Sequence, residues 1–189
     1  MGRVVKRFKA ISGERKVSGL AIVDTGADRS LLSNRAAKRL GVAPGITPVG
    51  ASFGVGDQPY LHWKYHVDLT VGEYSVDNLL VATPFAVVLG KKKTGEPITR
   101  RIRQSENLIG HDFLQEAKVP LNYRRPHDKI FGGKRRRLVF GIWREGTMTP
   151  ELLKLAREVE AKYFAGKKGW ATTKTKRPRT KRAGGKKRG

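Results

Sequence analysis

The sequence predicts a mostly β domain that is followed by a helix and a basic tail. Short runs of β-branched and aromatic residues, separated by turns that contain glycine, fill residues 1–145. A helical pattern occupies residues 146–165, and residues 166–189 are rich in Lys and Arg and of low complexity. A chain of 189 residues, 38% of them hydrophobic, suffices for about one domain with a modest core. We therefore expect one folded β domain, a C-terminal helix and a tail that is disordered when free.

Alternating apolar residues mark the strands of the β domain. The pattern is clearest over residues 61–71, where an apolar or aromatic side chain occupies every second position. Further strands are expected over residues 4–11, 17–23 and 138–143, and a short helix over residues 34–40 that ends at Gly41.

The C-terminal helix has signals at both of its ends. Thr149 can cap its N-terminus, Pro150 stands at the first helical position, and Gly166 follows its end. The apolar side of this helix predicts packing against the domain or a partner subunit rather than chemistry.

Composition narrows the classes of function. With a net charge of +24, the protein is attracted to nucleic acid or acidic lipid. The lack of cysteine excludes disulfides, cysteine nucleophiles and zinc sites with cysteine ligands. The longest apolar run, residues 79–89, is too short to cross a bilayer, and no signal peptide is visible, so we expect an intracellular, cytoplasmic protein without a membrane span. No cofactor or metal is expected, since His62, His66 and Asp68 fit the solvent-facing side of a strand better than a metal site.

One short segment carries a pattern that is typical of chemistry. An apolar run, residues 20–23, leads into Asp24-Thr25-Gly26-Ala27-Asp28, and a second apolar run follows. Gly26 allows the chain to turn sharply directly after a carboxylate. An ordinary Asp-Thr-Gly turn between two strands is the alternative interpretation.

A second segment, residues 107–114, strengthens the first. Leu108 and Ile109 lead into Gly110, and a short helix is expected directly afterwards. Together the two segments resemble the retropepsins, the aspartic peptidases of retroviruses and their cellular relatives. In that family an apolar run enters Asp-Thr-Gly-Ala, and two apolar residues, a Gly, any residue and an Asp follow later in the chain. The resemblance covers about residues 4–143.

The resemblance implies a closed β-barrel of the acid-protease type, which works as a homodimer on peptide or protein substrates. Asp24 would be the catalytic residue, on a loop at the dimer axis. Thr25 and Gly26 would support that loop, with Leu108, Ile109 and Gly110 beneath it. The residues implied in substrate binding are Gly26, Ala27 and Asp28 and, in a Gly-rich hairpin flap within residues 50–59, Phe53, Gly54, Val55 and Gly56. An ordinary surface hairpin is the alternative for the flap, and Arg29 is a candidate for setting a preference for charge.

The chemistry needs a second carboxylate. A general base must activate water while a general acid protonates the substrate, and the two groups share one proton. The chain contains Asp-Thr-Gly only once, so the second carboxylate would be Asp24 of a second subunit. We therefore expect an aspartic endopeptidase in which water is activated between two Asp24 carboxylates.

Two other functions stay open from the sequence. The domain could be a non-catalytic module of a nucleoprotein assembly that binds RNA or DNA through basic loops and the tail, or the protease unit of a retroelement polyprotein. The tail residues expected to contact nucleic acid, without sequence preference, are Lys174, Lys176, Arg177, Arg179, Lys181 and Arg182.

Deleting the tail tests its part in nucleic-acid binding. Residues 167–188 contain 11 Lys or Arg residues and no acidic residue. Each phosphate that they neutralise contributes about −0.7 to the slope of log K against log salt for single strands. Removing residues 167–189 should therefore weaken the binding of a single-stranded RNA of random sequence and flatten this slope, while cleavage of a short neutral peptide is unchanged. A salt titration of the full-length and truncated proteins checks this, and identical slopes would contradict it.

Overall fold

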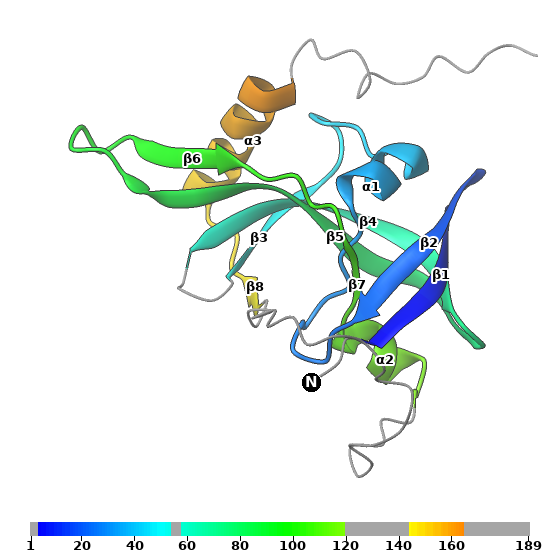
Figure 1. Ribbon diagram of the computed structural model, residues 1–189. Helices are drawn as coiled ribbons and strands as arrows, with labels where there is room; N and C mark the ends of the chain where they lie inside the picture. The colour runs from blue at the N-terminus through cyan, green and yellow to red at the C-terminus, as the bar shows by residue number, and fades with distance from the viewer. Residues whose placement is uncertain (1–3, 54–57, 120–143, 165–189) are drawn as a thin grey trace, which may run out of the picture.

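One sheet runs through the protein, and helices pack against parts of it (Figure 1). The computed structural model describes residues 4–53, 58–119 and 144–164. The strands in these ranges are β1 (Val4–Ser12), β2 (Arg15–Val23), β3 (Val49–Phe53), β4 (Pro59–Val71), β5 (Tyr74–Lys91), β6 (Pro97–Arg101), β7 (Asn107–Ile109) and β8 (Arg144–Gly146). The helices are α1 (Asn34–Leu40), α2 (His111–Glu116) and α3 (Pro150–Phe164). The prediction of a mostly β protein with a C-terminal helix is confirmed.

The long strand β4 organises the sheet. The strand order is β6-β5-β4-β1-β2-β7, with β3 beside β4 and β8 beside β3. Along one edge, β4 pairs first with β3, at residues 59–63, and then with β1, at residues 68–71. Its other edge pairs with β5. The pairing of β2 with β7 is parallel, whereas the other strand pairs of the described residues are antiparallel.

The expectation of a closed β-barrel is wrong for the described residues, because their sheet stays open. Its path ends at β6 and β7, which do not pair with each other. The outer edge of β7 is taken by a single residue, Leu31, which exchanges two backbone hydrogen bonds of 2.9 and 2.7 Å with Leu108. Leu31 also forms an isolated bridge with Ala82 of β5. One residue, instead of a strand, therefore spans the space between β7 and β5.

Most of the predicted elements have close counterparts. The predicted strands at 4–11, 17–23 and 61–71 correspond to β1, β2 and β4, and the predicted helix at 34–40 matches α1. Gly41 ends α1 in the left-handed region, with φ of 88°. The predicted strand at 138–143 lies outside the described residues.

The sequence pattern does not predict β5, which is the longest strand described. Pro84 interrupts its apolar run, and Asn78 has a positive φ of 55° within it. Both residues lie beside the two places where the register between β4 and β5 shifts. Such bulges let a strand continue past residues that disfavour regular pairing, and they obscure its period of two.

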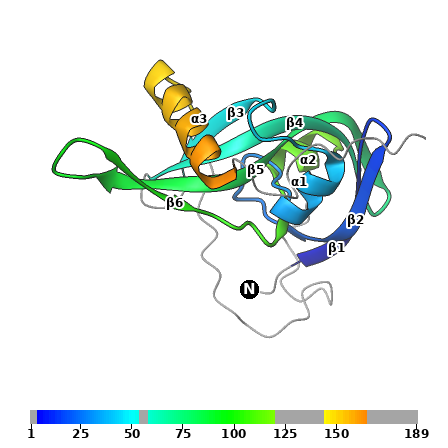
Figure 2. The same cartoon turned by 90° about the horizontal axis from the view of Figure 1, so that it is seen from above.

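Two clusters of buried side chains form most of the core. The first includes Phe8, Leu69 and Phe113 and joins the sheet to α1 and α2. The second includes Trp63 and Phe85 and lies between the sheet and α3. Figure 2 shows α1 and α3 over separate regions of the sheet. The C-terminal helix therefore completes the core of the β domain, which is one of the two positions expected for it. No helix within the described ranges has the length and apolar character needed to cross a bilayer.

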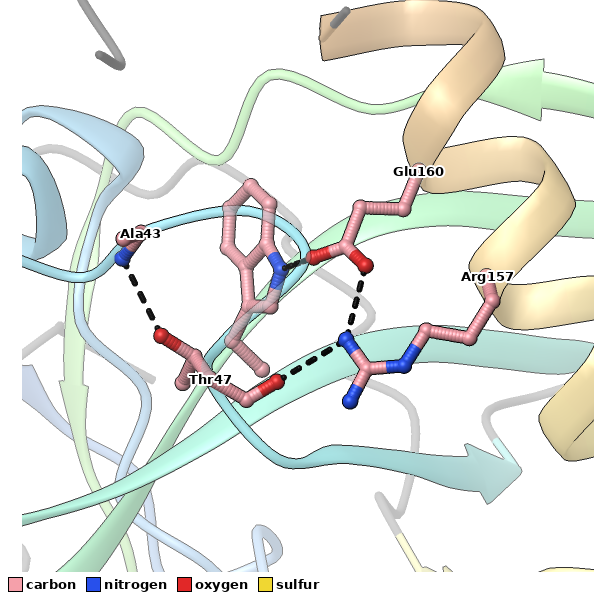
Figure 3. A network of polar contacts seen from close by, with 5 residues as sticks. Ala43, Thr47, Arg157 and Glu160 are labelled. Atoms are coloured by element: carbon pink, nitrogen blue, oxygen red, sulfur yellow. Dashed lines mark hydrogen bonds and ion pairs between the residues drawn. The ribbon is translucent and has the colours of Figure 1, made fainter.

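Aromatic contacts and one buried carboxylate fasten α3 to the sheet, and Figure 3 shows this carboxylate, Glu160, beside Arg157. The ring centroid of Trp63 lies 4.7 Å from that of Phe85 and 5.0 Å from that of Phe164. Glu160 is only 2% exposed, and its carboxylate accepts hydrogen bonds from Trp63 Nε1, at 2.5 Å, and from Arg157 Nη1, at 2.8 Å. The same guanidinium nitrogen donates to the carbonyl of Thr47 at 3.2 Å. The buried charge is thus both paired and hydrogen-bonded, as its burial requires.

Replacing Glu160 with alanine tests this anchor. Glu160→Ala would remove the carboxylate that pairs with Arg157 and accepts from the buried Trp63 Nε1–H, which should lower the free energy of unfolding by about 3 kcal/mol. Urea unfolding measures the loss. The matched control is Glu158→Ala, on the exposed side of the same helix, which should cost at most about 0.5 kcal/mol. Equal losses in the two variants would show that the buried network does not hold α3.

Candidate active site

The loop that carries Asp24, residues 24–30, is held by β7 and by the first turn of α2. β2 and β7 pair so that Val23 lies opposite Ile109, and the N–H of Asp24 donates to the Ile109 carbonyl at 2.9 Å. Further along the loop, the N–H of His111 donates to the Ala27 carbonyl at 2.7 Å. That N–H belongs to the first turn of α2, whose amides have no partners within the helix. The loop and the helix therefore satisfy each other's backbone groups.

Asp112 secures the end of the loop. Both of its carboxylate oxygens lie 2.9 Å from the N–H of Ser30, and Oδ1 also accepts the Ser30 hydroxyl proton at 2.7 Å. The N–H of Phe113 donates to the same oxygen at 2.7 Å. Ser30 is fully buried, and its hydroxyl oxygen accepts from the N–H of Gly110 at 2.9 Å. Burial raises the pKa of Asp112, while the hydrogen bonds from Ser30 and Phe113 act in the opposite direction.

Gly110 is required by the close approach of the two segments. A Cβ atom at this position would lie 2.5 Å from the carbonyl carbon of Arg29 and 2.8 Å from the carbonyl oxygen of Ala27. Both atoms belong to the backbone of the Asp24 loop, which is itself fixed by hydrogen bonds. Only glycine therefore fits here without displacing the loop.

The carboxylate of Asp24 has two different oxygens. Oδ1 accepts a hydrogen bond from the N–H of Gly26 at 3.0 Å. Oδ2 is buried and has no hydrogen-bonding partner among the described residues. Burial raises the pKa of Asp24, and the bond from Gly26 opposes this only in part. Such a carboxyl group, with a raised pKa and an unsatisfied oxygen, is typical of a functional site.

The loop presents some residues to solvent and buries others. Thr25, Gly26 and Asp28 are exposed, whereas Ala27 is fully buried. Ile22 and Leu108, together with Leu31 and Ala82, form a small apolar cluster at the base of the loop. The structure thus brings together Asp24, its neighbours in the motif, and the segment Leu108–Gly110, which was matched with it in the sequence. Ala82 and Ser30 are members of this site that no local pattern indicates.

The segment expected to form a flap is a hairpin of β3 and β4. Phe53 lies opposite Pro59 in the register. Three of the residues implied in substrate binding, Gly54, Val55 and Gly56, lie outside the described residues. The half-buried Phe53 is the last residue of β3. The second edge of β3 is not open, because β8 pairs with it.

Two further side chains were singled out in the sequence, and one of them, His62, does not lie where it was expected. Arg29 donates to the Leu80 carbonyl of β5 at 2.9 Å and so links the loop to that strand. His62 is 2% exposed and does not face solvent. Its partner in the register is Gly50, and a Cβ there would lie 2.6 Å from His62 Nε2, so the missing side chain of Gly50 makes room for the imidazole.

No cluster of three His, Cys, Asp or Glu side chains suited to a metal ion occurs within the described part of the chain.

No protein-family model matches the chain, and no curated protein matches it either.

The raised pKa of Asp24 predicts how its replacement changes stability with pH. The carboxyl group of Asp24 binds a proton more tightly in the folded state than in the unfolded state. It therefore favours folding below its ordinary pKa of 3.8, where it is protonated in both states. This contribution to stability is lost as the pH rises through the pKa of the folded state. Asp24→Asn should therefore melt at a higher temperature than the wild type at about pH 7, with a smaller difference at about pH 3. Asp28→Asn, an exposed change in the same loop, should show no such gain. A pH-independent difference for Asp24→Asn would contradict the assignment.

Proposed function

We propose that the protein is an aspartic endopeptidase of the retropepsin type, which works as a homodimer with Asp24 as its catalytic residue. The observation that carries the proposal is the carboxylate of Asp24. It stands on a loop fixed at both ends, one of its oxygens is bound by the Gly26 N–H, and the other is buried without a partner among the described residues. A rigid backbone around a carboxyl group with a raised pKa is the preorganisation that general acid–base catalysis needs.

The second carboxylate would come from a second copy of the chain. Two copies related by a twofold axis would bring their Asp24 side chains together and let them share one proton. The exposed Thr25 and Gly26 leave the tip of the loop accessible to such a partner. The ionised Asp24 would take a proton from water, which attacks the scissile carbonyl carbon. The protonated Asp24 would donate to the carbonyl oxygen, so no covalent intermediate with the enzyme forms.

Substrate would bind in an extended conformation along the loop. Gly26 and Asp28 lie exposed beside Asp24 and offer backbone groups to a peptide. The hairpin of β3 and β4, which ends at Phe53 and Pro59, would cover the opposite side of the peptide. Ala27 is buried in the single chain, and its contribution would be to keep the loop close to Gly110.

A second candidate is a non-catalytic module that binds nucleic acid. The observation that favours it is the charge of +24, to which the tail at residues 167–188 contributes 11 basic side chains. Binding of nucleic acid by the tail would also be compatible with peptidase activity, because the tail and the Asp24 loop are separate parts of the sequence.

Replacing Asp24 and mixing subunits tests the enzyme together with its shared site. Asp24→Asn keeps the shape of the side chain and should lower the rate of cleavage of an unfolded protein at about pH 5 by at least about a thousandfold. An equal mixture with the wild type should show about half the activity of the wild-type protein that it contains, because hybrid dimers are inactive. The control for mixing is Asp77→Asn, an exposed change on β5 that should not reduce activity. An active Asp24→Asn variant would refute the catalytic assignment, and activity that is unaffected by mixing would refute the shared site.

A further inference from the structure

The chain supplies its own partner for the outer edge of β3. β8 pairs in antiparallel fashion with the last three residues of β3: Ala51 lies opposite Gly146, Ser52 opposite Glu145, and Phe53 opposite Arg144. These three residues are the last of β3, and they face Pro59, Tyr60 and Leu61 of β4 on the other edge of the strand. Without β8, the backbone N–H and C=O groups on this edge would be free to pair with any extended chain.

β8 is far more weakly attached than the helix that follows it. It has three residues, and β3 is its one strand partner within the described part of the sheet. α3, in contrast, is held by the buried Glu160 and by the contacts of Trp63 with Phe85 and Phe164. Tyr163 adds a hydrogen bond from its hydroxyl to the Thr99 carbonyl of β6, at 2.9 Å. β8 can therefore leave β3 while α3 stays in place and keeps it tethered nearby.

The fit of β8 depends on a glycine. A Cβ at Gly146 would lie 2.3 Å from Cε2 and 2.8 Å from Cδ2 of Phe53, so the Phe53 ring covers the position where a side chain would otherwise stand. Gly146 does not have a positive φ, so this requirement is one of space and not of backbone conformation. A larger residue at position 146 would therefore require the Phe53 ring to move.

We propose that the outer edge of β3 is a binding site for an extended peptide, and that β8 occupies this site as an internal competitor. The ligand is a peptide strand that carries a small residue, best glycine, opposite Ala51 and against Phe53. Backbone hydrogen bonds to residues 51–53 provide the affinity, and the Phe53 ring provides the selection. Peptide binding at this edge does not depend on the proposed peptidase activity.

The fraction of molecules in which β8 is paired with β3 would set the apparent affinity for an added peptide. If β8 is paired in about nine molecules of ten, a peptide added from outside sees only the remaining tenth, and its affinity falls about tenfold. Removing the tail would not change this, because β8 and α3 precede residue 167. Anything that draws β8 away from β3 would open the site without unfolding the domain.

Two substitutions that displace β8 by different means test the proposal. Gly146→Val places a branched side chain against the Phe53 ring, and Glu145→Pro removes a backbone N–H from the middle of the strand. The control is Thr147→Val, which follows β8 at an exposed position. All of the proteins carry Asp24→Asn, so that no peptide is cleaved. The probe is a fluorescent peptide with the sequence of residues 144–149, Arg-Glu-Gly-Thr-Met-Thr.

Both displaced variants should bind this peptide more tightly than the wild type and the Thr147→Val control, by up to about tenfold. Changing the glycine of the peptide to valine should abolish the gain. Hydrogen exchange at residues 51–53 should be faster in both variants and should slow again when the peptide is added, while exchange within α3 is unchanged. Two results would overturn the proposal. One is equal affinity for the peptide in the wild type, the control and both displaced variants. The other is a displaced variant in which residues 51–53 exchange rapidly but which does not bind the peptide. Because binding is measured without cleavage, a failure of the proposed peptidase activity would not produce either of these results.

Discussion

The parallel pairing of β2 with β7 is the contact on which the rest of the site depends. It places the end of one strand, Val23, beside the end of another, Ile109, so that two chain segments leave the sheet at the same point. The loop after β2 and the first turn of α2 then share their backbone hydrogen bonds. Asp112 and Ser30 close this arrangement through a carboxylate that accepts three donors. A carboxyl group with a raised pKa, Asp24, is thereby supported on rigid elements and not on a free loop.

Local patterns account for much of the fold and for part of the site. β1, β2, β4 and α1 follow from period and capping, which act over a few residues. The Asp24 turn is equally local, because the Asp24 carboxylate accepts a hydrogen bond from the N–H of Gly26, two residues later in the chain. The open sheet could not be foreseen from such patterns: it depends on Leu31, a single residue, filling the edge of β7 in place of a strand. The Ser30–Asp112 contact joins positions 82 apart in the sequence, so no window of the sequence contains it.

The C-terminal part of the chain changes how the hairpin of β3 and β4 is understood. From the sequence, this hairpin resembles a mobile cover, because it is rich in glycine. In the structure, its base is backed by α3 through Trp63, and its outer edge carries β8. Burying the charged Glu160 among aromatic side chains is costly unless each of its partners is present. Their presence fixes the position of α3 against the sheet, and β8 precedes this helix by only three residues.

The distance in sequence between the two halves of the Asp24 site also governs when the site can exist. During synthesis on the ribosome, residues 24–30 emerge early, but the strand and helix that hold them, β7 and α2, are made only after residue 106. Contacts of such long range form late, because the intervening chain must first be ordered. Until then the Asp24 turn has no β7 to pair with and no α2 to bind its carbonyls. A nascent chain therefore contains the Asp24 carboxylate long before it contains β7 and α2, which hold the Asp24 loop. Any chemistry at Asp24 can begin only after these later segments have been made and have folded.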